Sequence, residues 1–118
     1  MKNTIIAENY VGINGVSPDV YGAFVSLGHN LIGDSTSSTG FFGDGDQVGT
    51  AANPLDPMLA PLAFNGGPTQ THAPLQGSSA IDGGDNAGAP ATDQRGVARP
   101  RDGDGNGSKV VDIGAFER

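Results

Sequence analysis

The chain has 118 residues, of which 20 are Gly and 8 are Pro, with no Cys and a formal net charge of −7. Because Gly and Pro are the poorest helix formers, this composition excludes a mainly helical protein and favours short strands joined by tight turns. The acidic balance excludes nucleic acid as a partner, and no apolar run reaches the roughly 18 residues that a membrane span requires.

The first half of the chain predicts three short strands and one long loop. Residues 3–9 form a β-branched run bounded by Asn, which is typical of a strand. Turn-forming residues follow over 12–19, and residues 20–25 and 26–33 then predict the second and third strands. Residues 34–49 are mostly Ser, Thr, Gly and Asp, which predicts a long polar insertion.

The second half alternates extended chain with turns. Three prolines within residues 53–62 exclude a regular helix or a central strand there. Residues 69–73 and 79–82 predict two short strands, and residues 110–116 predict a closing strand.

A weak internal repeat suggests how these strands are arranged. Asn3-Thr4-Ile5-Ile6 is echoed by Asn30-Leu31-Ile32-Gly33 at an offset of 27 residues. Stacked repeats have periods of about 20–45 residues. Together with the short strands, this spacing predicts a solenoid whose coils each contribute a few residues to parallel sheets.

Four ordered blocks carry a family resemblance. Residues 65–73, 77–84, 92–100 and 111–117 resemble the C-terminal part of bacterial right-handed parallel β-helix surface proteins, the "choice-of-anchor Q" type of the pectin-lyase-like superfamily. The resemblance implies an exported, cell-surface setting. It leaves the chemistry open, because one fold hosts many functions.

The fold expected from these observations is all-β, a right-handed parallel β-helix of about four or five coils with long loops. We expect one domain over residues 1–118, a C-terminal fragment of a longer protein, with no leader in this chain. The first coil would then be open, which predicts either a homodimer through that end or protection by Met1 and a rearranged N-terminus. The leading function is a structural or binding module that binds Ca²⁺ and recognises glycan.

The most specific local motif lies near the C-terminus. Asp102-Gly103-Asp104-Gly105-Asn106-Gly107 matches the first half of a calcium loop, in which oxygen ligands alternate with Gly. The twelfth position of such a loop, normally Glu, is Ile here. The predicted Ca²⁺ ligands are Asp102, Asp104, Asn106, the Ser108 carbonyl and Asp112. The alternative is a solvated turn that holds no ion.

A second set of residues has two interpretations. Asp93, Arg95 and Arg99, with Asp82 and Asp112, favour charge-assisted hydrogen bonds that hold the terminal turns. The alternative is an enzyme, either a carbohydrate-active lyase or hydrolase or a metal-assisted hydrolase of small esters. Its candidate catalytic residues would be His72, Asp93 and Arg95.

One aromatic pair stands inside the polar loop. Phe41-Phe42 predicts a loop anchor folded onto the core, with a sugar-stacking platform as the alternative. The acidic turns Asp44-Gly45-Asp46 and Asp82-Gly83-Gly84-Asp85-Asn86 are predicted to be solvated, with weak cation binding as the alternative.

Overall fold

A computed structural model describes residues 1–11, 15–16 and 18–118. Gly12, Asn14 and Ser17 of the predicted turn lie outside these residues. The chain divides into two compact units, Met1–Pro57 and Met58–Arg118, here called the N-terminal unit and the C-terminal unit.

Strands occur only in the N-terminal unit among the described residues, and none of these residues is helical. Accordingly, no helix in the described part of the chain is long and apolar enough to cross a membrane. Each strand has two or three residues, and the seven are β1 (Ile5–Ile6), β2 (Tyr10–Val11), β3 (Gly15–Val16), β4 (Tyr21–Ala23), β5 (Leu31–Ile32), β6 (Ser37–Thr39) and β7 (Gln47–Val48).

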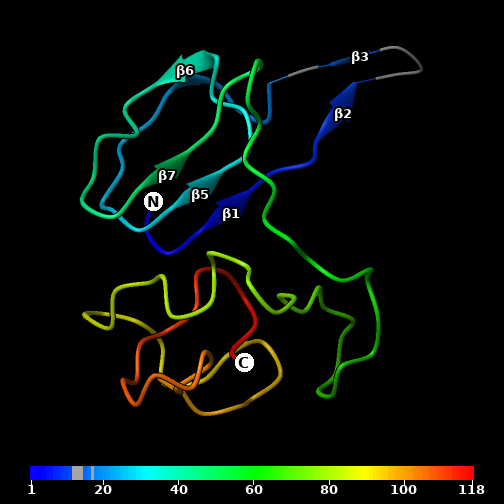
Figure 1. Ribbon diagram of the computed structural model, residues 1–118, viewed down its shortest axis with the longest axis vertical. Helices are drawn as coiled ribbons and strands as arrows, with labels where there is room; N and C mark the ends of the chain where they lie inside the picture. The colour runs from blue at the N-terminus through cyan, green and yellow to red at the C-terminus, as the bar shows by residue number, and fades with distance from the viewer. Residues whose placement is uncertain (12–14, 17) are drawn as a thin grey trace. The chain divides into compact units, whose positions relative to one another are not determined.

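Two of the three sheets are parallel. The larger has the order β1-β5-β7, with Leu31 paired to Ile5 on one side and to Gln47 on the other (Figure 1). Strands β4 and β6 form the second parallel pair, with Gly22 opposite Ser38. Strands β2 and β3 pair antiparallel.

A small apolar core fills the N-terminal unit. Val20, Ile32 and Phe41 are buried together, and Phe24 packs against them. The rings of Phe24 and Phe41 stack with their centroids 5.0 Å apart. Phe41 therefore anchors the polar loop to the core, whereas the side chain of Phe42 is 89 % exposed.

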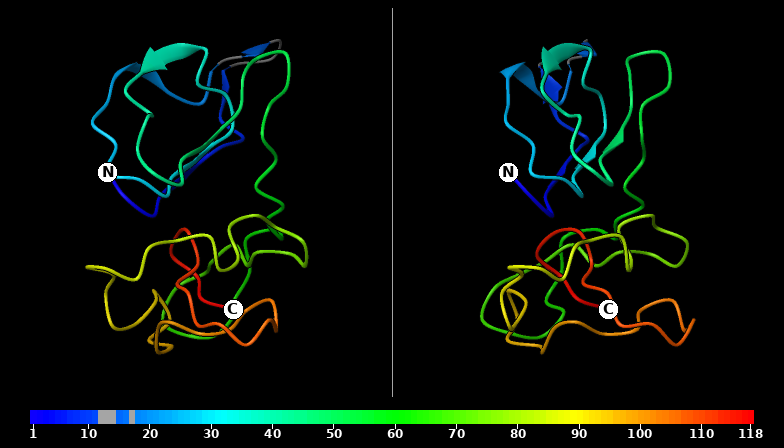
Figure 2. Two further views of the ribbon diagram at one scale, coloured as in Figure 1. Left: turned by 60° about the vertical axis from the view of Figure 1, so that its left-hand side comes forward. Right: turned by 90° about the vertical axis from the view of Figure 1, so that its left-hand side faces the viewer.

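The C-terminal unit has no strand, only isolated bridges between residues such as Ala63 and Thr71 or Arg101 and Val110 (Figure 2). Its buried apolar side chains are few, and buried charged residues accompany them. The apolar members are Ala80, Val111 and Ile113, and the charged members are Asp93, Asp112 and Glu117.

The predicted right-handed parallel β-helix is wrong. The described residues form two small parallel sheets and one antiparallel pair, with no sheet that closes or continues as a solenoid. The offset from β1 to β5 is 26 residues in the register, but the next step, Leu31 to Gln47, is only 16, so the spacing is not that of a regular repeat. Left-handed backbone at Asn3 and Glu8, on either side of β1, also keeps that strand short.

Several predicted elements differ from the structure as well. Residues 34–49 are no projecting insertion, because they carry β6 and β7, which pair with β4 and β5. Residues 79–82 form turns, and the segments 69–73 and 110–116 contribute one bridging residue each. Pro68 and Pro74 flank the first of these bridging segments and Gly114 lies within the second, so neither extends into a ladder.

Candidate functional site

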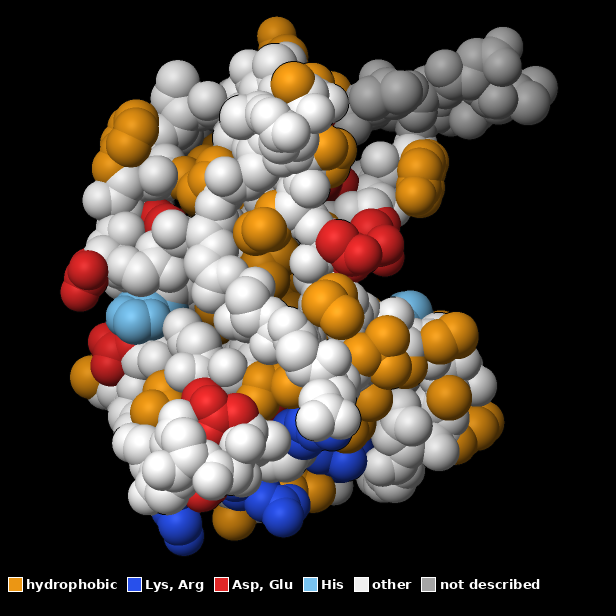
Figure 3. Space-filling view, in the orientation of Figure 1, with side chains coloured by type: hydrophobic (Ala, Val, Ile, Leu, Met, Phe, Trp, Pro, Cys, Tyr) orange, Lys and Arg blue, Asp and Glu red, His pale blue; other side chains and the backbone are white. Residues whose placement is uncertain are grey.

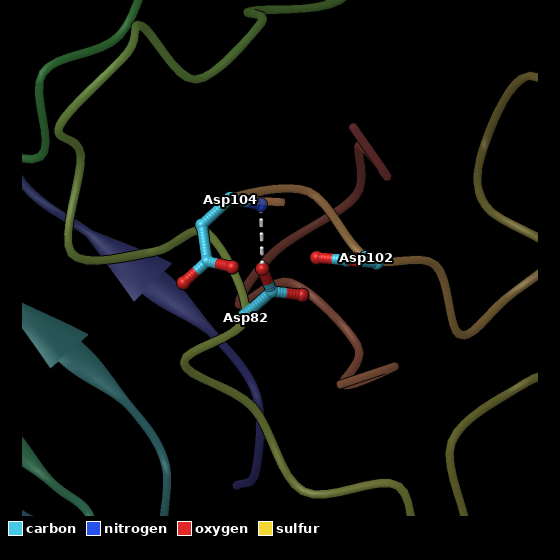
Figure 4. A group of neighbouring side chains, drawn as sticks. All are labelled: Asp82, Asp102 and Asp104. Atoms are coloured by element: carbon cyan, nitrogen blue, oxygen red, sulfur yellow. Dashed lines mark hydrogen bonds between the residues drawn. The ribbon is translucent and has the colours of Figure 1, made fainter. Parts of the chain in front are cut away.

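Three carboxylates come together in the C-terminal unit, and we call Asp82, Asp102 and Asp104 the acidic triad. One oxygen of each lies within 4.8 Å of the others. Figure 4 shows the Asp82 carboxylate facing the loop that carries Asp102 and Asp104. Asp82 has left-handed backbone, with a φ of 51°, and it sits in a turn immediately before Gly83.

Main-chain amides of the same loop stabilise the acidic triad. The Asp82 carboxylate accepts hydrogen bonds from the N–H of Gly103 at 3.0 Å and of Asp104 at 2.8 Å. Asp102 accepts from the N–H of Gly105 and of Gly107, at 2.8 and 2.9 Å. These amide dipoles offset the repulsion among three neighbouring negative charges.

Asp104 completes the loop in the same way, because its carboxylate accepts from the N–H and the side-chain amide of Asn106. Every carboxylate oxygen of the triad thus accepts a hydrogen bond. An ionised carboxylate oxygen has two lone-pair positions. Oδ2 of Asp82 uses both of them for Gly103 and Asp104, and each other oxygen of the triad keeps one that can face a cation. Hard oxygen ligands of this kind suit Ca²⁺.

Of the predicted ligands, the structure brings the carboxylates of Asp102 and Asp104 together. The side-chain oxygen of Asn106 accepts from the N–H of Ser108 at 2.7 Å. The carboxylate of Asp112 is buried, where it accepts from the N–H of Asp82 and of Arg118, both at 2.8 Å.

The third member of the acidic triad, Asp82, was predicted to lie in a separate acidic turn. It is 20 residues from Asp102 in sequence, so motif spacing alone does not connect the two. The sequence signal that fits is the Gly pair after Asp82, which favours a sharp turn able to aim a carboxylate at another loop.

A second set of charged residues centres on Asp93, which is 7 % exposed. One carboxylate oxygen accepts from the N–H of Arg95 and of Val97, at 2.8 and 3.0 Å. The other accepts from the Arg95 Nε and from the N–H of Glu117, both at 2.9 Å. Four hydrogen bonds use the lone-pair positions of an ionised carboxylate, so Asp93 is a structural acceptor.

Arg95 links three segments of the unit. Besides Asp93, its guanidinium donates to the carbonyl oxygens of Asn65 and Glu117. The guanidinium carbon lies 3.4 Å from the centroid of the Phe116 ring, which adds a cation–π contact. This arrangement holds the C-terminal segment in place.

Glu117 and Arg99 form the second buried ion pair, with 2.7 Å between Nε of Arg99 and Oε2 of Glu117. The Glu117 carboxylate also accepts from the N–H of Arg101 and of Asp112. The remaining donors of Arg99 bond the carbonyl oxygens of Asp112 and Gly114. Arg99 and Glu117 are thus satisfied by each other and by main chain, as a buried ion pair requires.

Burial and hydrogen bonding move the pKa values of two of these acids in opposite directions. Burial works to raise the pKa of Asp93, but the hydrogen bonds from Glu117, Val97 and Arg95 outweigh it and lower that pKa. Burial raises the pKa of Asp112, and the charges of Glu117 and Asp82 add to this effect against the hydrogen bonds from Asp82 and Arg118.

The structure places the remaining candidate residues elsewhere. The ring Nδ1 of His72 lies 2.8 Å from the carbonyl oxygen of Ala60, and the His72 side chain is exposed. No hydrogen bond joins His72 to Asp93 or Arg95 within the described residues. Sugar stacking at Phe42 stays a prediction.

Basic side chains are concentrated in the C-terminal unit, which carries five of the six Lys and Arg residues of the chain. Figure 3 shows those visible from one side, in the same orientation as Figure 1. The side chains of two of them, Arg95 and Arg99, are 12 % and 6 % exposed and lie in the ion pairs described above. These two positive charges thus have their partners within the unit.

Comparison with known proteins found no match to a family model, a curated protein or a solved structure. The resemblance to β-helix surface proteins, the exported setting, the homodimer and the lyase or hydrolase activity therefore stay predictions. What the chain offers for a functional argument is its own geometry.

Proposed function

We propose that this chain is a structural module of an exported or cell-surface protein, in which the C-terminal unit presents loops held by buried charges. The observation that carries the proposal is that the Asp93 carboxylate already accepts four hydrogen bonds from the chain itself. An acid that accepts four hydrogen bonds has no lone pair ready for a proton from a substrate. The exported setting rests on the resemblance of the four sequence blocks.

Arg95 supports the same function. A catalytic Arg has to direct donors at a substrate, but the Arg95 guanidinium donates to Asp93, Asn65 and Glu117 and lies over a Phe ring. Its side chain is only 12 % exposed. Arg95 is therefore best explained as a clamp on the C-terminal segment.

Replacing the clamp tests this proposal. We expect Arg95→Ala to lower the melting temperature strongly, because it leaves Asp93 buried without its cation. Arg101→Ala, at an exposed Arg of the same unit, is the matched control and should melt close to the unchanged chain. If Arg95→Ala melted like the control, the structural role would be refuted.

We propose Ca²⁺ binding at the acidic triad as a second function of the same unit. The supporting observation is the approach of one oxygen from each of Asp82, Asp102 and Asp104 to within 4.8 Å of the others. A cation would relieve the repulsion among three carboxylates. The loop amides already do so in part, so we expect weak affinity, in the range of about 10⁻⁴–10⁻³ M that is typical of extracellular modules.

Thermal melting with millimolar Ca²⁺ and then with EDTA tests this second function. A ligand that binds only the folded state raises the melting temperature, so we expect an upward shift that EDTA reverses. Asp82→Asn should remove the shift. Asp44→Asn, in the acidic turn of the N-terminal unit, should keep it. A shift of equal size in both variants would place the ion elsewhere.

A further inference from the structure

The link between the two units contains a bond of unusual chemistry. Of the eight X–Pro bonds in the chain, Asp56–Pro57 is the one that follows an Asp. The boundary between the compact units lies directly after Pro57. We propose that Asp56–Pro57 is a self-cleavage site, hydrolysed in mild acid by the Asp56 side chain, which divides the chain into residues 1–56 and 57–118.

The reaction needs only water besides the chain itself. A γ-carboxyl oxygen of Asp56 attacks its own main-chain carbonyl carbon and closes a five-membered anhydride. The C–N bond to Pro57 breaks, and the nitrogen takes up a proton and leaves as a secondary amine. Water then opens the anhydride, so Asp56 regains its side-chain carboxyl and gains a terminal one. An attacking group held beside its target has a large advantage over free water.

Proline directs the reaction toward cleavage. After an Asp, the N–H of the next residue normally attacks the side-chain carboxyl and forms a cyclic imide, which isomerises the bond without breaking the chain. Pro has no N–H, so this competing path is closed at residue 57. It stays open at the four Asp–Gly bonds, which follow Asp44, Asp82, Asp102 and Asp104.

The structure leaves the reacting side chain accessible to water. Asp56 is exposed and lies outside every strand, while the Pro57 ring is fully buried. The N–H of Leu55, one residue earlier, donates to the carbonyl oxygen of Gly33 at 2.9 Å. The bond is thus held between two anchored residues, with its carboxyl at the surface.

Few titratable residues lie near the bond in the sequence. Asp56 is the only titratable residue between Asp46 and His72 in the sequence. On the segment that packs against Leu55, the nearest acid in sequence to Gly33 is Asp34, whose carboxylate accepts from the N–H and hydroxyl of Thr36.

The position of the bond determines the products. Cleavage removes one residue, Pro57, from the N-terminal unit and leaves it on the C-terminal fragment. The hydrogen bonds that fix each side, from Leu55 to Gly33 and from Leu75 to the Met58 carbonyl, stay within one product each. Cleavage at this bond therefore leaves these hydrogen bonds and the strand pairing of the N-terminal unit intact.

Intact-mass spectrometry of the full chain, incubated at about pH 4 where a carboxylic acid and its carboxylate coexist, tests the proposal. We expect one pair of fragments, residues 1–56 and 57–118, whose masses add up to the chain plus one water. Asp56→Glu should slow the cut severalfold or more, because its anhydride ring is larger. Asp44→Glu, an exposed acid of the same unit, should cleave like the unchanged chain.

A parallel incubation in urea separates the chemistry of the bond from the effect of the fold. Cleavage of the folded chain at a rate within severalfold of the unfolded chain supports the site. An intact folded chain beside a cleaved unfolded one would overturn it, because the fold would then protect the bond. Equal cutting of Asp56→Glu and the unchanged chain would overturn the role of the carboxyl.

Discussion

The two units stabilise their backbones in different ways. In the N-terminal unit, main chain pairs with main chain: the N–H of Leu31 donates to Thr4, that of Gly33 to Ile6 and that of Gln47 to Asn30. In the C-terminal unit, carboxylates collect main-chain N–H groups: Asp93 accepts three and Glu117 accepts two, within about 3 Å. The difference shows that a unit without paired strands needs side-chain acceptors for its main-chain N–H groups.

Buried N–H and C=O groups require partners wherever they lie. Parallel strands supply these partners at regular intervals, which frees the side chains of β5 to be apolar and fully buried. A loop-rich unit has no such regularity, so polar side chains have to reach the orphan groups. This explains why Asp93, Asp112 and Glu117 are buried beside a few apolar residues in the C-terminal unit.

The largest expected loss of stability follows from removing one partner of a buried ion pair in the C-terminal unit. Arg99→Ala leaves Glu117 buried without a cation and leaves two carbonyl groups without donors. Removing one partner of a buried pair costs about 3–5 kcal/mol of unfolding free energy. Chemical denaturation measures this loss, and hydrogen exchange should show it in residues 58–118.

The matched control for this variant is Arg101→Ala, because Arg101 lies two residues away and its side chain is exposed. Its main-chain N–H still reaches Glu117. We expect a change within about 0.5 kcal/mol, as for an ordinary surface substitution. Equal losses in the two variants would contradict a stabilising role for buried charge.

The next effect belongs to the apolar core of the N-terminal unit. Ile32→Ala removes a side chain that is 0 % exposed and packed against Val20 and Phe41. Such a deletion costs about 2–5 kcal/mol, because it loses apolar contact and leaves a cavity. Val48→Ala changes the partner of Ile32 in β7, which is 39 % exposed, and should cost less. A larger loss for Val48→Ala in denaturant melts would refute this core.

These contrasts show how far the sequence predicted the fold. The β-branched run at Ile5-Ile6 and its echo at Leu31-Ile32 do form paired parallel strands, because apolar periodicity reports burial directly. The long-range arrangement was wrong, since the same local pattern fits a solenoid and a small sheet equally well. Strand β6 has the sequence Ser-Ser-Thr, which carries no apolar signal, so the sequence predicts a loop there.

The candidate site was predicted in part. The alternation of Asp and Gly identified Asp102 and Asp104, since a loop of that kind exposes carboxylates wherever it folds. Asp82 joins them only because a left-handed turn 20 residues earlier aims it there. No sequence motif reports that two residues this far apart in sequence meet in the folded chain. The clamp role of Arg95 was foreseen from the charges, but its contact with the Phe116 ring was not.

A smaller loss of stability is expected in the N-terminal unit, where one polar side chain links segments by hydrogen bonds of its own. Asn30 is fully buried, and its amide accepts from the N–H of Thr4 and donates to Ser26 and Asp46. Asn30→Ala leaves these partners unsatisfied and should cost about 1–3 kcal/mol. Asn53→Ala, at an exposed Asn, is the control, and equal denaturation midpoints would contradict the role of the buried amide.

The smallest effect is the dependence of the stability of the C-terminal unit on pH. Asp93 and Asp112 should contribute to it in opposite directions. The pKa of Asp93 is lowered by its hydrogen bonds, so its stabilisation is present above the ordinary Asp value of 3.8 and is lost as the pH falls through the lowered pKa. Burial raises the pKa of Asp112, so its stabilisation is present below 3.8 and is lost as the pH rises through the raised pKa.

Melting curves of Asp93→Asn and Asp112→Asn, compared with the unchanged chain from neutral to acidic pH, test this opposition. The advantage of the unchanged chain over Asp93→Asn should shrink in acid, because protonation of Asp93 removes what the variant already lacks. Its advantage over Asp112→Asn should grow in acid, because the neutral Asp112 suits its buried place. If both differences in melting temperature changed with pH in the same direction, the opposite pKa shifts of Asp93 and Asp112 would be refuted. The hydrogen-bond partners of the two carboxyls would then not set their separate contributions to stability.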